Sequence, residues 1–289
     1  GLLAEGQSNK VIARNLDITR SSVGVHIANL MKKGLLKGKG YVLGSDYVVV
    51  IGASNVDIFG DVENMKLHDS NIGKISTSLG GVGRNIAENI GLLGIDVKLV
   101  STIGSDVYGK KILEETSNVD LNHIQVVDGR TGVYLSVGKE MLLAINDMQI
   151  NDSFTVESVE RLDSIIRLSK VIVIDTNFSK EVIEYVVNKY KDHLIVLDTV
   201  STFKAEKVKD FIGKFHTIKP NKIEAELLSG IEINSESDLH KASEFFHKSG
   251  VKDVFITLGS EGVYYSNKLD KGFISAPKTK VVNATGAGD

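Results

Sequence analysis

Polar residues recur at one position along this chain, directly after its short apolar segments. These residues are Asn55 and Asp57, Asp106, Asp175 and Asn177, Asp198 and Thr199, Asn221 and Glu224, and Thr257 and Gly259. Carboxylate, amide and hydroxyl groups could bind the hydroxyls of a ligand, organise a metal ion or accept a proton. A single Asp at such a place is explained by a turn or a helix cap, but six sets in the same position indicate one shared site.

The last residues of the chain could stabilise a transferring phosphoryl group. Gly286, Ala287, Gly288 and Asp289 place three small residues and a carboxylate where a helix should begin. Backbone N–H groups that converge at a helix start bind anions, and an Asp in that turn could take a proton from an attacking hydroxyl. Taken alone, these four residues are a weak match to a motif.

Two further segments combine glycine with helix-forming sequence. Residues 80–85 (GGVGRN) open an expected helix, where glycine lets the backbone lie against a ligand. Their spacing does not fit a dinucleotide fingerprint, because Ile86 stands where the third glycine is needed. Residues 104–111 nearly match a Walker A loop, but Lys111 replaces the hydroxyl that would bind magnesium, so we reject that interpretation. A helix N-terminus with Asp106 near its first turn explains this segment.

The elements that must position these residues follow from the hydrophobic pattern. Continuous apolar segments predict buried strands at 47–53, 97–104, 170–177, 193–200, 216–221 and 253–259. Helical segments alternate with them at 84–93, 107–117, 155–168, 179–190, 222–229 and 235–249. This alternation predicts an α/β fold with a doubly wound, mainly parallel sheet, whose ligands collect at the carboxyl ends of the strands.

Two stretches, 58–79 and 124–147, do not fit this alternation. Val133, Leu135 and Val137 alternate with other residues in the second stretch, which is typical of a half-buried strand. We expect both stretches to form short antiparallel strands of a small sheet outside the core. Such a sheet could act as a lid over the site.

The first 46 residues form a separate pattern. Helices are expected at 8–16 and 20–33, and two short strands around a basic glycine turn at 34–43, which is the layout of a winged helix-turn-helix. In a DNA-binding interpretation, Arg20, Ser21, Ser22 and His26 reach base edges, while Lys37 and Lys39 meet phosphates. The alternative is a dimerisation or docking module with a solvated basic face.

Charge and composition support two domains, at 1–46 and 47–289. The net charge of −3 divides into seven basic against three acidic residues in the first part and 27 against 34 in the second. No apolar segment is long enough to cross a membrane and no signal peptide pattern is present, so we expect a cytoplasmic protein. The absence of cysteine excludes disulfides and thiolate chemistry, and the seven histidines show no spacing typical of a metal site.

Residues 47–289 resemble the ribokinase-like (PfkB-type) family of sugar and nucleoside kinases in both the order and the spacing of their motifs. The motifs are Asn55-x-Asp57, Gly80-Gly81-x-x-x-Asn85, Ser101-x-x-Gly104-x-Asp106-x-x-Gly109, Asn221-x-x-Glu224, Thr257-x-Gly259-x-x-Gly262 and Gly286-Ala287-Gly288-Asp289. Within the family, segments 80–87, 142–148, 197–208 and 216–230 are most similar to the pseudouridine kinase group, some members of which carry an N-terminal helix-turn-helix.

The resemblance implies an ATP-dependent kinase that phosphorylates the 5′-hydroxyl of pseudouridine. The alternatives are another ribokinase-like sugar or nucleoside kinase, or a metabolite-responsive DNA-binding regulator with a kinase-like sensor domain. The implied cofactors are ATP and Mg²⁺, and activation by a monovalent cation stays open, because Asn283 and Ala284 depart from the residues more common there. The implied partners are a small-molecule substrate, DNA at residues 1–46 and a second copy of the chain in a homodimer.

The resemblance also implies a role for each motif. Asp57 and Asn85 would bind the ribose 2′- and 3′-hydroxyls, close to the backbone of Gly80 and Gly81, and Asp289 would act as the base. The amides of residues 286–289 would stabilise the γ-phosphoryl group. The implied magnesium and nucleotide residues are Asn221, Glu224, Thr257, Gly259 and Gly262. The candidates for binding the uracil edge are Asn146, Asp147, Asn177 and Thr199.

Because the family continues beyond this last motif, we expect the chain to be a fragment of a longer protein. The C-terminal part of the kinase-like domain, including part of the adenine pocket, would then be missing.

Overall fold

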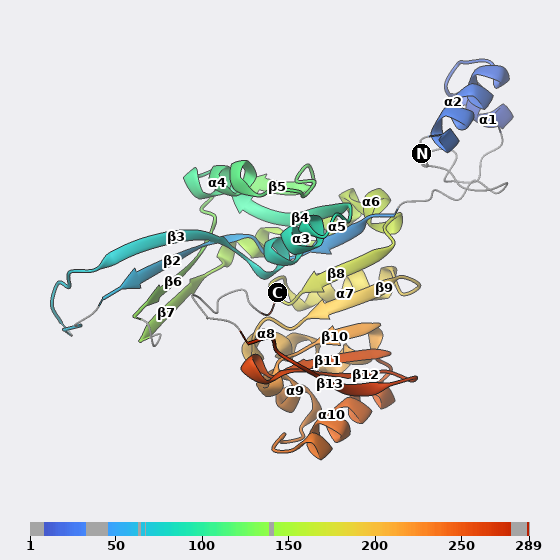
Figure 1. Cartoon of the computed structure of the whole chain (residues 1–289). Helices are drawn as coiled ribbons and strands as arrows, with labels where there is room; N and C mark the ends of the chain where they lie inside the picture. Colours follow the sequence, from blue (N-terminus) through green and yellow to red (C-terminus); the bar gives the residue numbers. More distant parts are fainter. Residues whose placement is uncertain are drawn as a thin grey trace.

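The computed structural model describes residues 9–32, 46–62, 65–66, 68–138, 142–278 and 288. Within this part of the chain, a nine-stranded sheet in the order β13-β12-β11-β10-β9-β8-β1-β4-β5 forms the centre (Figure 1). Its strands are β1 (Val48–Ile51), β4 (Val97–Gly104), β5 (Ile124–Val127), β8 (Val171–Asp175), β9 (Leu194–Asp198), β10 (Thr217–Lys219), β11 (Asp253–Thr257), β12 (Gly262–Ser266) and β13 (Lys271–Ser275).

The predicted parallel sheet is confirmed. The six strands expected from the apolar segments all pair in parallel, and β5 joins them in parallel at the edge next to β4. The antiparallel hairpin of β12 and β13 at the other edge was not expected. Because adjacent parallel strands end on the same side, the polar residues that follow them share one edge of the sheet.

Helices cover both faces of the sheet, and strand β1 shows why its residues are apolar throughout. Val49 and Ile51 face a core packed with side chains of α5 to α10, whereas Val50 on the opposite face packs in a second core that includes Ala87 of α3. The helices are α3 (Val82–Leu92), α4 (Val107–Glu115), α5 (Val156–Arg161), α6 (Asp163–Arg167), α7 (Lys180–Lys189), α8 (Thr202–Ala205), α9 (Lys222–Ser229) and α10 (Glu236–Ser249).

Two helical regions differ from the prediction. The helix expected at 155–168 is divided into α5 and α6 at Leu162, where no glycine or proline marks the break. After β9, the short helix α8 continues into the 3-10 helix η2 (Glu206–Lys214), which was not expected. Shorter 3-10 helices are η1 (Gln149–Ser153) and η3 (Gly259–Glu261).

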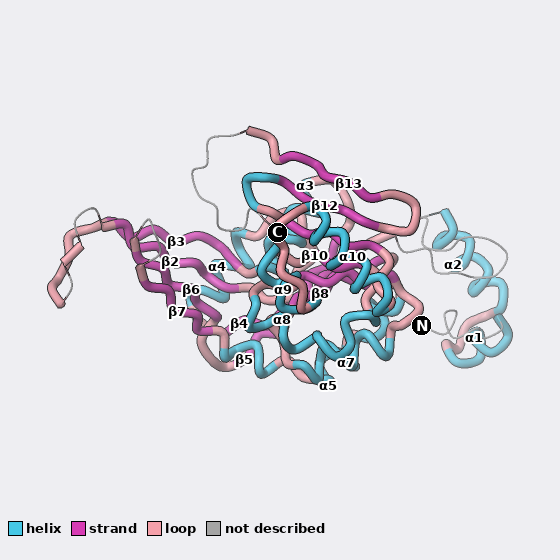
Figure 2. The backbone as a smooth tube through the Cα atoms, turned by 90° about the horizontal axis from the view of Figure 1, so that it is seen from below, coloured by secondary structure: helices cyan, strands magenta, loops and turns pink. Residues whose placement is uncertain are grey.

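A second, four-stranded sheet projects from the central one, as Figures 1 and 2 show. It has the order β3-β2-β6-β7, from β2 (Asn55–Asp61), β3 (Lys74–Gly80), β6 (Gly132–Val137) and β7 (Leu143–Asp147), and we call it the lid sheet. The expectation of a small separate sheet is confirmed, with two corrections. Strands β2 and β6 pair in parallel, and residues 124–127 belong to the central sheet, because Ile124 packs in its core.

The N-terminal residues form the two expected helices, α1 (Asn9–Asn15) and α2 (Arg20–Lys32). They pack through the buried side chains Ile12, Ala13, Val23 and Ile27. The hydroxyl of Thr19 accepts a hydrogen bond from the Ser22 amide at 3.1 Å, so Thr19 caps the second helix. The strands expected at 34–43 lie outside the described residues.

None of the helices in the described ranges combines the length and the hydrophobicity that a membrane span requires.

Candidate active site

Asp57 lies at the base of the lid sheet, where β2 leaves the central sheet. Its carboxylate accepts a hydrogen bond from the Asn55 side chain at 2.6 Å. Asn55 pairs in register with Gly80 of β3, and a Cβ atom built on Gly80 would lie 2.4 Å from the Asp57 carboxylate. Glycine is therefore required at position 80, because a side chain would displace the carboxylate.

Arg84, which we did not predict, connects this group to Asn85. The guanidinium is buried and donates to the Gly80 carbonyl at 3.3 Å and to the Asn85 side-chain oxygen at 2.5 Å. Its remaining nitrogen pairs with Glu88 at 2.8 Å. Asn55, Asp57, Gly80 and Asn85 are thus brought together, as the motif positions imply. An Arg in the first turn of a helix gives no sequence signal for such a buried role, because most are solvated.

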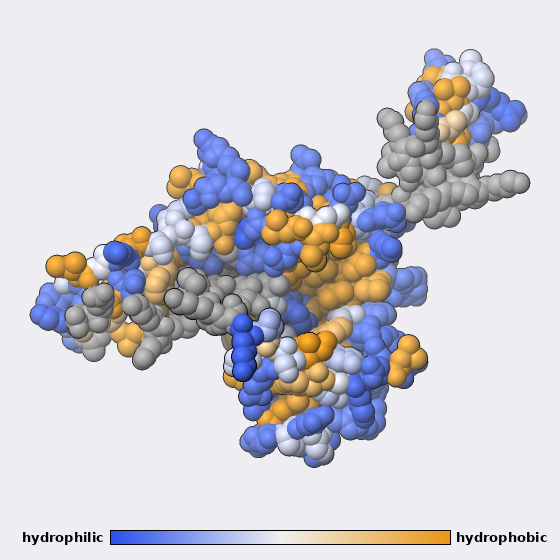
Figure 3. Space-filling view, in the orientation of Figure 1, coloured by the Kyte–Doolittle hydropathy of each residue, from blue (hydrophilic) through white to orange (hydrophobic). Residues whose placement is uncertain are grey.

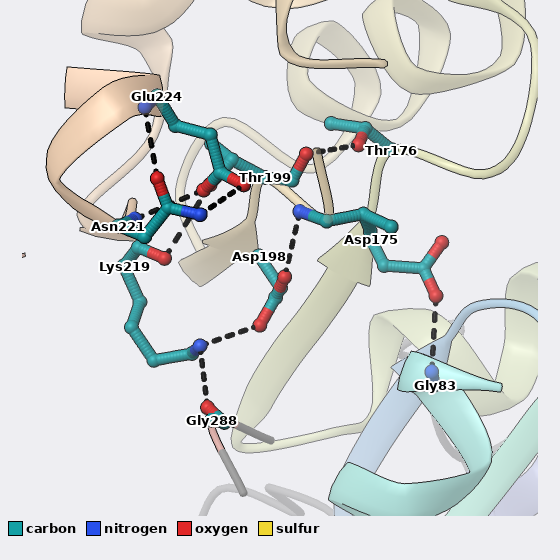
Figure 4. A network of polar contacts seen from close by, with 10 residues as sticks. Gly83, Asp175, Thr176, Asp198, Thr199, Lys219, Asn221, Glu224 and Gly288 are labelled. Carbon is teal, nitrogen blue, oxygen red and sulfur yellow. Dashed lines mark hydrogen bonds and ion pairs between the residues drawn. The ribbon is translucent and has the colours of Figure 1, made fainter. Parts of the chain in front are cut away.

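Asp175 fixes the backbone that carries these residues. Asp175 is 1% exposed, and its carboxylate accepts N–H bonds from Ala53 at 2.9 Å, Asn177 at 2.8 Å and Gly83 at 3.0 Å, the last of which Figure 4 shows. Burial raises the pKa of Asp175, although the N–H groups of Asn177 and Ala53 oppose this effect. The carboxylate thereby joins the end of β8, the end of β1 and the first turn of α3.

The approach of β1 to α3 leaves no room for side chains. A Cβ atom on Gly83 would lie 2.5 Å from the Gly52 Cα, and Gly81 has φ 95°, a conformation that favours glycine. The glycines of residues 80–85 therefore have a structural basis in close packing at this turn.

Asn177 has a second partner that the sequence did not indicate, the half-buried Lys204 of α8. The Lys204 ammonium group donates to the Asn177 side-chain oxygen at 2.5 Å. Burial lowers the pKa of Lys204, and the nearby Asp175 carboxylate partly opposes that shift. A lysine on an unpredicted helix could be assigned to this edge only after the chain was folded.

Thr199 does not belong to this group. It is fully buried, and its hydroxyl donates to the Glu224 carboxylate at 2.5 Å. The expected contact of Thr199 with a base stays a prediction, and it would require the hydroxyl to leave the Glu224 carboxylate.

The register of the lid sheet decides which of its polar residues face the same way as Asp57. Asp57 pairs with Tyr134, and Tyr134 pairs with Asn146, so these three side chains lie in one row on one face. Asp147 is in register with Val133 and Val56, on the opposite face. The expected contact of Asp147 with the ligand stays a prediction, but Asp147 does not share the face of Asn146, because neighbouring residues of a strand point to opposite faces. Tyr134 was not predicted.

Asn221 and Glu224 form a reciprocal cap at the start of α9. The Asn221 side chain accepts the Glu224 amide at 2.9 Å, and the buried Glu224 carboxylate accepts the Asn221 amide at 2.9 Å and its side-chain nitrogen at 2.7 Å. Asn221 also pairs with Thr257, the last residue of β11. The cap places a buried negative charge at the carboxyl edge of the sheet (Figure 4).

A cavity of about 630 Å³ opens beside this cap. Asn221, Thr257 and Gly259 line it together with the apolar side chains of Ile223 and Phe273. Gly262, in contrast, begins β12 with φ 121°, and a Cβ there would lie 2.0 Å from the Ile274 carbonyl oxygen. The glycine at 262 thus permits the β12–β13 pairing, and its expected nucleotide contact stays a prediction.

One residue of the C-terminal motif is described. The carbonyl of Gly288 accepts a hydrogen bond from Lys219 at 2.6 Å. Gly286, Ala287 and Asp289 lie outside the described residues. Because Lys219 is the last residue of β10, its contact places Gly288 at the same edge of the sheet as Asp198 and Asn221 (Figure 4).

Asp106 has the structural role expected of it. It caps α4, accepting the Gly109 amide at 2.9 Å, and its second oxygen accepts the Thr131 amide at 3.0 Å. Burial acts to raise the pKa of Asp106, but the hydrogen bonds from Thr131 and Gly109 outweigh it, so the pKa lies below its ordinary value. Across the residues whose placement is described, no cluster of three or more His, Asp or Glu side chains could hold a metal ion.

The residues expected to contact DNA lie at the start of α2. Arg20, Ser21 and His26 are exposed. The hydroxyls of Ser21 and Ser22 lie 2.8 and 2.9 Å from that of Thr19, within the helix cap. Lys37 and Lys39 lie outside the described residues.

Comparison with known proteins matches two regions of the chain. The model of the pfkB family of carbohydrate kinases matches residues 45–289, and that of the luxR family of bacterial regulatory proteins matches residues 1–37. A pseudouridine kinase of Escherichia coli (strain K12) is 42% identical over 252 residues, which cover 84% of this chain and 80% of the relative. From the same organism, the uncharacterized sugar kinase YeiI is 39% identical over 287 residues, covering 96% of this chain and 79% of the relative.

Among solved structures, Arabidopsis thaliana ribokinase complexed with ribose and ATP superimposes with a TM-score of 0.75 at 23% identity, covering 84% of this chain and 82% of that one. This similarity establishes the ribokinase-like fold.

Proposed function

Because this chain belongs to the pfkB family of carbohydrate kinases, we propose that it transfers the γ-phosphoryl group of ATP to the 5′-hydroxyl of pseudouridine. Members of this family are phosphotransferases with an alcohol as acceptor. The observation that carries the proposal is the group formed by Asn55, Asp57, Gly80 and Asn85, joined through buried Arg84. The 42% identity to a pseudouridine kinase supports the choice of nucleoside.

The Asp57 group suits two neighbouring hydroxyls of a pentose. A carboxylate accepts hydrogen bonds from hydroxyls, and the amide of Asn85 can both donate and accept. Because Gly80 packs against the Asp57 carboxylate, the backbone of this turn would lie close to a sugar ring bound there. In this proposal the ribose 2′- and 3′-hydroxyls bind to Asp57 and Asn85.

The uracil ring would lie between two pairs of side chains. Asn177 and Lys204 form one pair, and Tyr134 and Asn146 on the lid sheet form the other. A uracil ring attached through carbon presents two carbonyl oxygens and two N–H groups. The Lys204 ammonium group can donate to a carbonyl oxygen, and an Asn side chain can pair with an amide edge. Because Lys204 is half-buried beside Asn177, its charge stays near the ligand instead of in bulk solvent.

The nucleotide would occupy the cavity lined by Asn221, Thr257 and Gly259, whose volume of about 630 Å³ is in the range of small-molecule sites. Both oxygens of Glu224 already accept hydrogen bonds, so this residue fits Mg²⁺ through ordered water and not as a direct ligand. Such an arrangement suits Mg²⁺, which usually keeps several waters and binds substrate phosphates. When bound, the ion would offset charge on the transferring phosphoryl group.

In the transfer step, the 5′-oxygen of the nucleoside bonds to the γ-phosphorus while the bond to the β,γ-bridging oxygen breaks and ADP leaves. The proton of the hydroxyl passes to the carboxylate of Asp289, and the amides of residues 286–289 donate to the phosphoryl oxygens. The contact of the Gly288 carbonyl with Lys219, at the end of β10, supports this assignment (Figure 4).

The test is a kinase assay of the intact protein with ATP, Mg²⁺ and pseudouridine, uridine, ribose or fructose. We expect kcat/KM for pseudouridine to exceed that for each competitor at least about tenfold, a difference of about 1.4 kcal/mol in transition-state binding. Asp289→Asn and Asp57→Asn should each remove at least about 99% of the activity. A preference for ribose would overturn the named substrate, and absence of transfer to all four acceptors would overturn the kinase.

A second candidate function is DNA binding by residues 1–46, so that the chain is a metabolite-responsive regulator with a kinase-like sensor. The match of residues 1–37 to the luxR family and the packed pair α1 and α2 favour it. In this proposal Arg20 at the start of α2 and His26 near its middle, both exposed, contact DNA in a winged helix-turn-helix. The hydroxyls of Ser21 and Ser22 already bond to Thr19 in the helix cap. In this proposal these two side chains therefore contribute less to DNA binding than Arg20 and His26.

The homodimer stays a prediction. The lid face opposite Asp57 carries exposed apolar side chains, among them Ile75 (80% exposed) and Ile145 (51% exposed), and Figure 3 shows apolar residues on the projecting lid. Pairing of two copies would cover such a surface. Light scattering of the intact protein measures the mass directly and would reveal a monomer.

A further inference from the structure

Lys219 connects two parts of the candidate site that no motif joins. It is the last residue of β10, in register with Asp198, the last residue of β9. Its ammonium group lies 2.8 Å from the Asp198 carboxylate and donates to the Gly288 carbonyl at 2.6 Å (Figure 4). The Lys219 side chain is 30% exposed, so it lies at the surface of the site with its charge directed inward.

Asp198 is the reason that this charge stays in place. Its side chain is 6% exposed, and its second oxygen accepts the amide of Val200 at 2.9 Å. Val200 has φ 60°, a left-handed conformation that a β-branched residue rarely adopts. Such a conformation persists only where its surroundings enforce it. Two hydrogen bonds constrain the backbone at Val200. The Val200 amide donates to Asp198, and the Thr176 hydroxyl donates to the Thr199 carbonyl at 2.7 Å.

We propose that Lys219 is a positioning residue for phosphoryl transfer, because its ammonium group, held by Asp198, fixes the backbone at Gly288 next to the base Asp289. This inference rests on the proposed function for the role of Asp289. Because the peptide group is planar, a carbonyl held by Lys219 restrains the peptide plane at Gly288. The contact would thereby orient the anion-binding turn before the nucleotide arrives, which is the condition for electrostatic stabilisation.

The charge of Lys219 has a second consequence at this edge. Two buried carboxylates, Asp198 and Glu224, lie on neighbouring elements close to the proposed position of the phosphates. The Lys219 ammonium group offsets the charge of Asp198, so the triphosphate would meet less repulsion. Arg can replace this charge and can still donate to a carbonyl, whereas Met can do neither.

The experiment compares three variants of the intact protein: Lys219→Met, Lys219→Arg and the double variant Lys219→Met with Asp198→Asn. Lys252→Met is the control, because this exposed lysine precedes β11 at the opposite end of the sheet. The double variant removes both charges, so it separates a lost contact to Gly288 from the cost of an unpaired buried carboxylate. Steady-state kinetics and hydrogen exchange of the peptide that contains Gly288 are measured for each.

We expect Lys219→Met to lower kcat about 100-fold with KM for the nucleoside within about threefold, since the loss falls on the transition state. The double variant should lose as much kcat as the single one, and Lys219→Arg should retain at least about a tenth of wild-type kcat. Exchange of the Gly288 peptide should accelerate at least about tenfold in Lys219→Met, with core peptides of β4 and the Lys252→Met control unchanged.

Normal kcat in the double variant, or unchanged exchange of the Gly288 peptide in both variants that lack Lys219, would overturn the proposal. If the wild-type protein phosphorylates no acceptor, the proposed function fails by itself. The exchange measurement then still decides whether Lys219 holds the backbone at Gly288.

Discussion

At the scale of single residues, the buried carboxylate of Asp175 has the clearest energetic consequence. Both oxygens accept backbone N–H bonds, from Ala53 and Gly83 on one side and from Asn177 on the other. An amide would place N–H donors against N–H donors on one of these sides. We therefore expect Asp175→Asn to lower the free energy of unfolding by about 2–3 kcal/mol, the cost of a buried donor without a partner.

Urea denaturation measures this effect, with the exposed Asp192→Asn as the control, for which we expect a change below about 0.5 kcal/mol. Equal stability of Asp175→Asn and the wild-type protein would show that the turn at Gly83 does not depend on the carboxylate.

How much of the site could be predicted also differs from residue to residue. Asn221 and Glu224 were recognisable from their position after a predicted strand and from the family motif, and the cap they form needs only their spacing of three residues. Arg84, Lys204 and Lys219 were not, because each acts through a partner that is brought near by the sheet. A long basic side chain has the same sequence appearance whether it reaches inward or into solvent.

At the scale of elements, the lid sheet was predictable as a separate unit but not in its pairing. Alternating apolar residues indicate a half-buried strand, yet they carry no information about which neighbour it takes. The parallel contact of β2 with β6 arises because both strands leave the central sheet in the same direction. Adjacent strand residues always point to opposite faces, and the register shows that Asn146, and not Asp147, lies on the face of Asp57.

This distinction gives a test with an adjacent residue as its control. We expect Asn146→Ala to raise KM for the nucleoside about tenfold, the value of one hydrogen bond of about 1.4 kcal/mol, because Asn146 shares the row of Asp57. Asp147→Ala, on the other face, should change KM less than about twofold, within the usual effect of a surface substitution. Equal effects of the two substitutions would contradict the register as the basis of substrate contact.

The ion pair between Lys98 of β4 and Asp120 anchors the segment that precedes β5. It also makes the free energy of unfolding depend on pH. Burial would raise the pKa of Asp120, but the Lys98 ammonium group at 2.5 Å and the Asn122 amide outweigh it and lower the pKa to about 2. Because the pKa in the folded protein lies below the ordinary value of 3.8, the stabilisation is complete above that value and is lost as the pH falls toward about 2.

Since both side chains are about a quarter exposed, solvent screening reduces the contribution to about 1 kcal/mol. Asp120→Asn should therefore be less stable than the wild-type protein by about 1 kcal/mol at pH 6, with the difference vanishing near pH 2. Denaturation curves across this pH range measure it. Glu114→Gln, in the exposed pair with Lys110 at 3.7 Å, is the control and should change stability by less than about 0.3 kcal/mol at any pH. A constant difference for Asp120→Asn at all pH values would contradict the ionic origin.

At the scale of the whole molecule, charge is divided unequally between two regions of the chain. Residues 1–46 carry an excess of four positive charges, and residues 47–289 carry an excess of seven negative charges. The sequence predicted the parallel sheet because strands buried on both faces are apolar throughout, and the helix pair because Ile12, Val23 and Ile27 recur at helical spacing. It could not predict the β12–β13 hairpin, whose pairing depends on Gly262 in a backbone conformation that no local pattern specifies.

If the basic region binds DNA independently of the kinase site, a substitution at its surface should separate the two activities. Arg20 is exposed at the start of α2, where a recognition helix presents its side chains to a groove. Arg20→Ala should weaken DNA binding at 50 mM salt about tenfold, since the loss of one base-edge contact costs about 1–3 kcal/mol. It should leave kcat/KM of phosphoryl transfer within about twofold, since Arg20 takes no part in the candidate active site.

Fluorescence polarisation with duplex DNA at several salt concentrations, alongside the kinase assay, measures both quantities. Lys252→Met removes the same charge from the kinase region and should alter neither, because salt screens electrostatic attraction beyond about 14 Å at this ionic strength. An equal loss of affinity in both variants would mean that net charge, and not the helix pair, attracts DNA. No binding by the wild-type protein at low salt would exclude the regulatory function and leave residues 1–46 the role of a docking module.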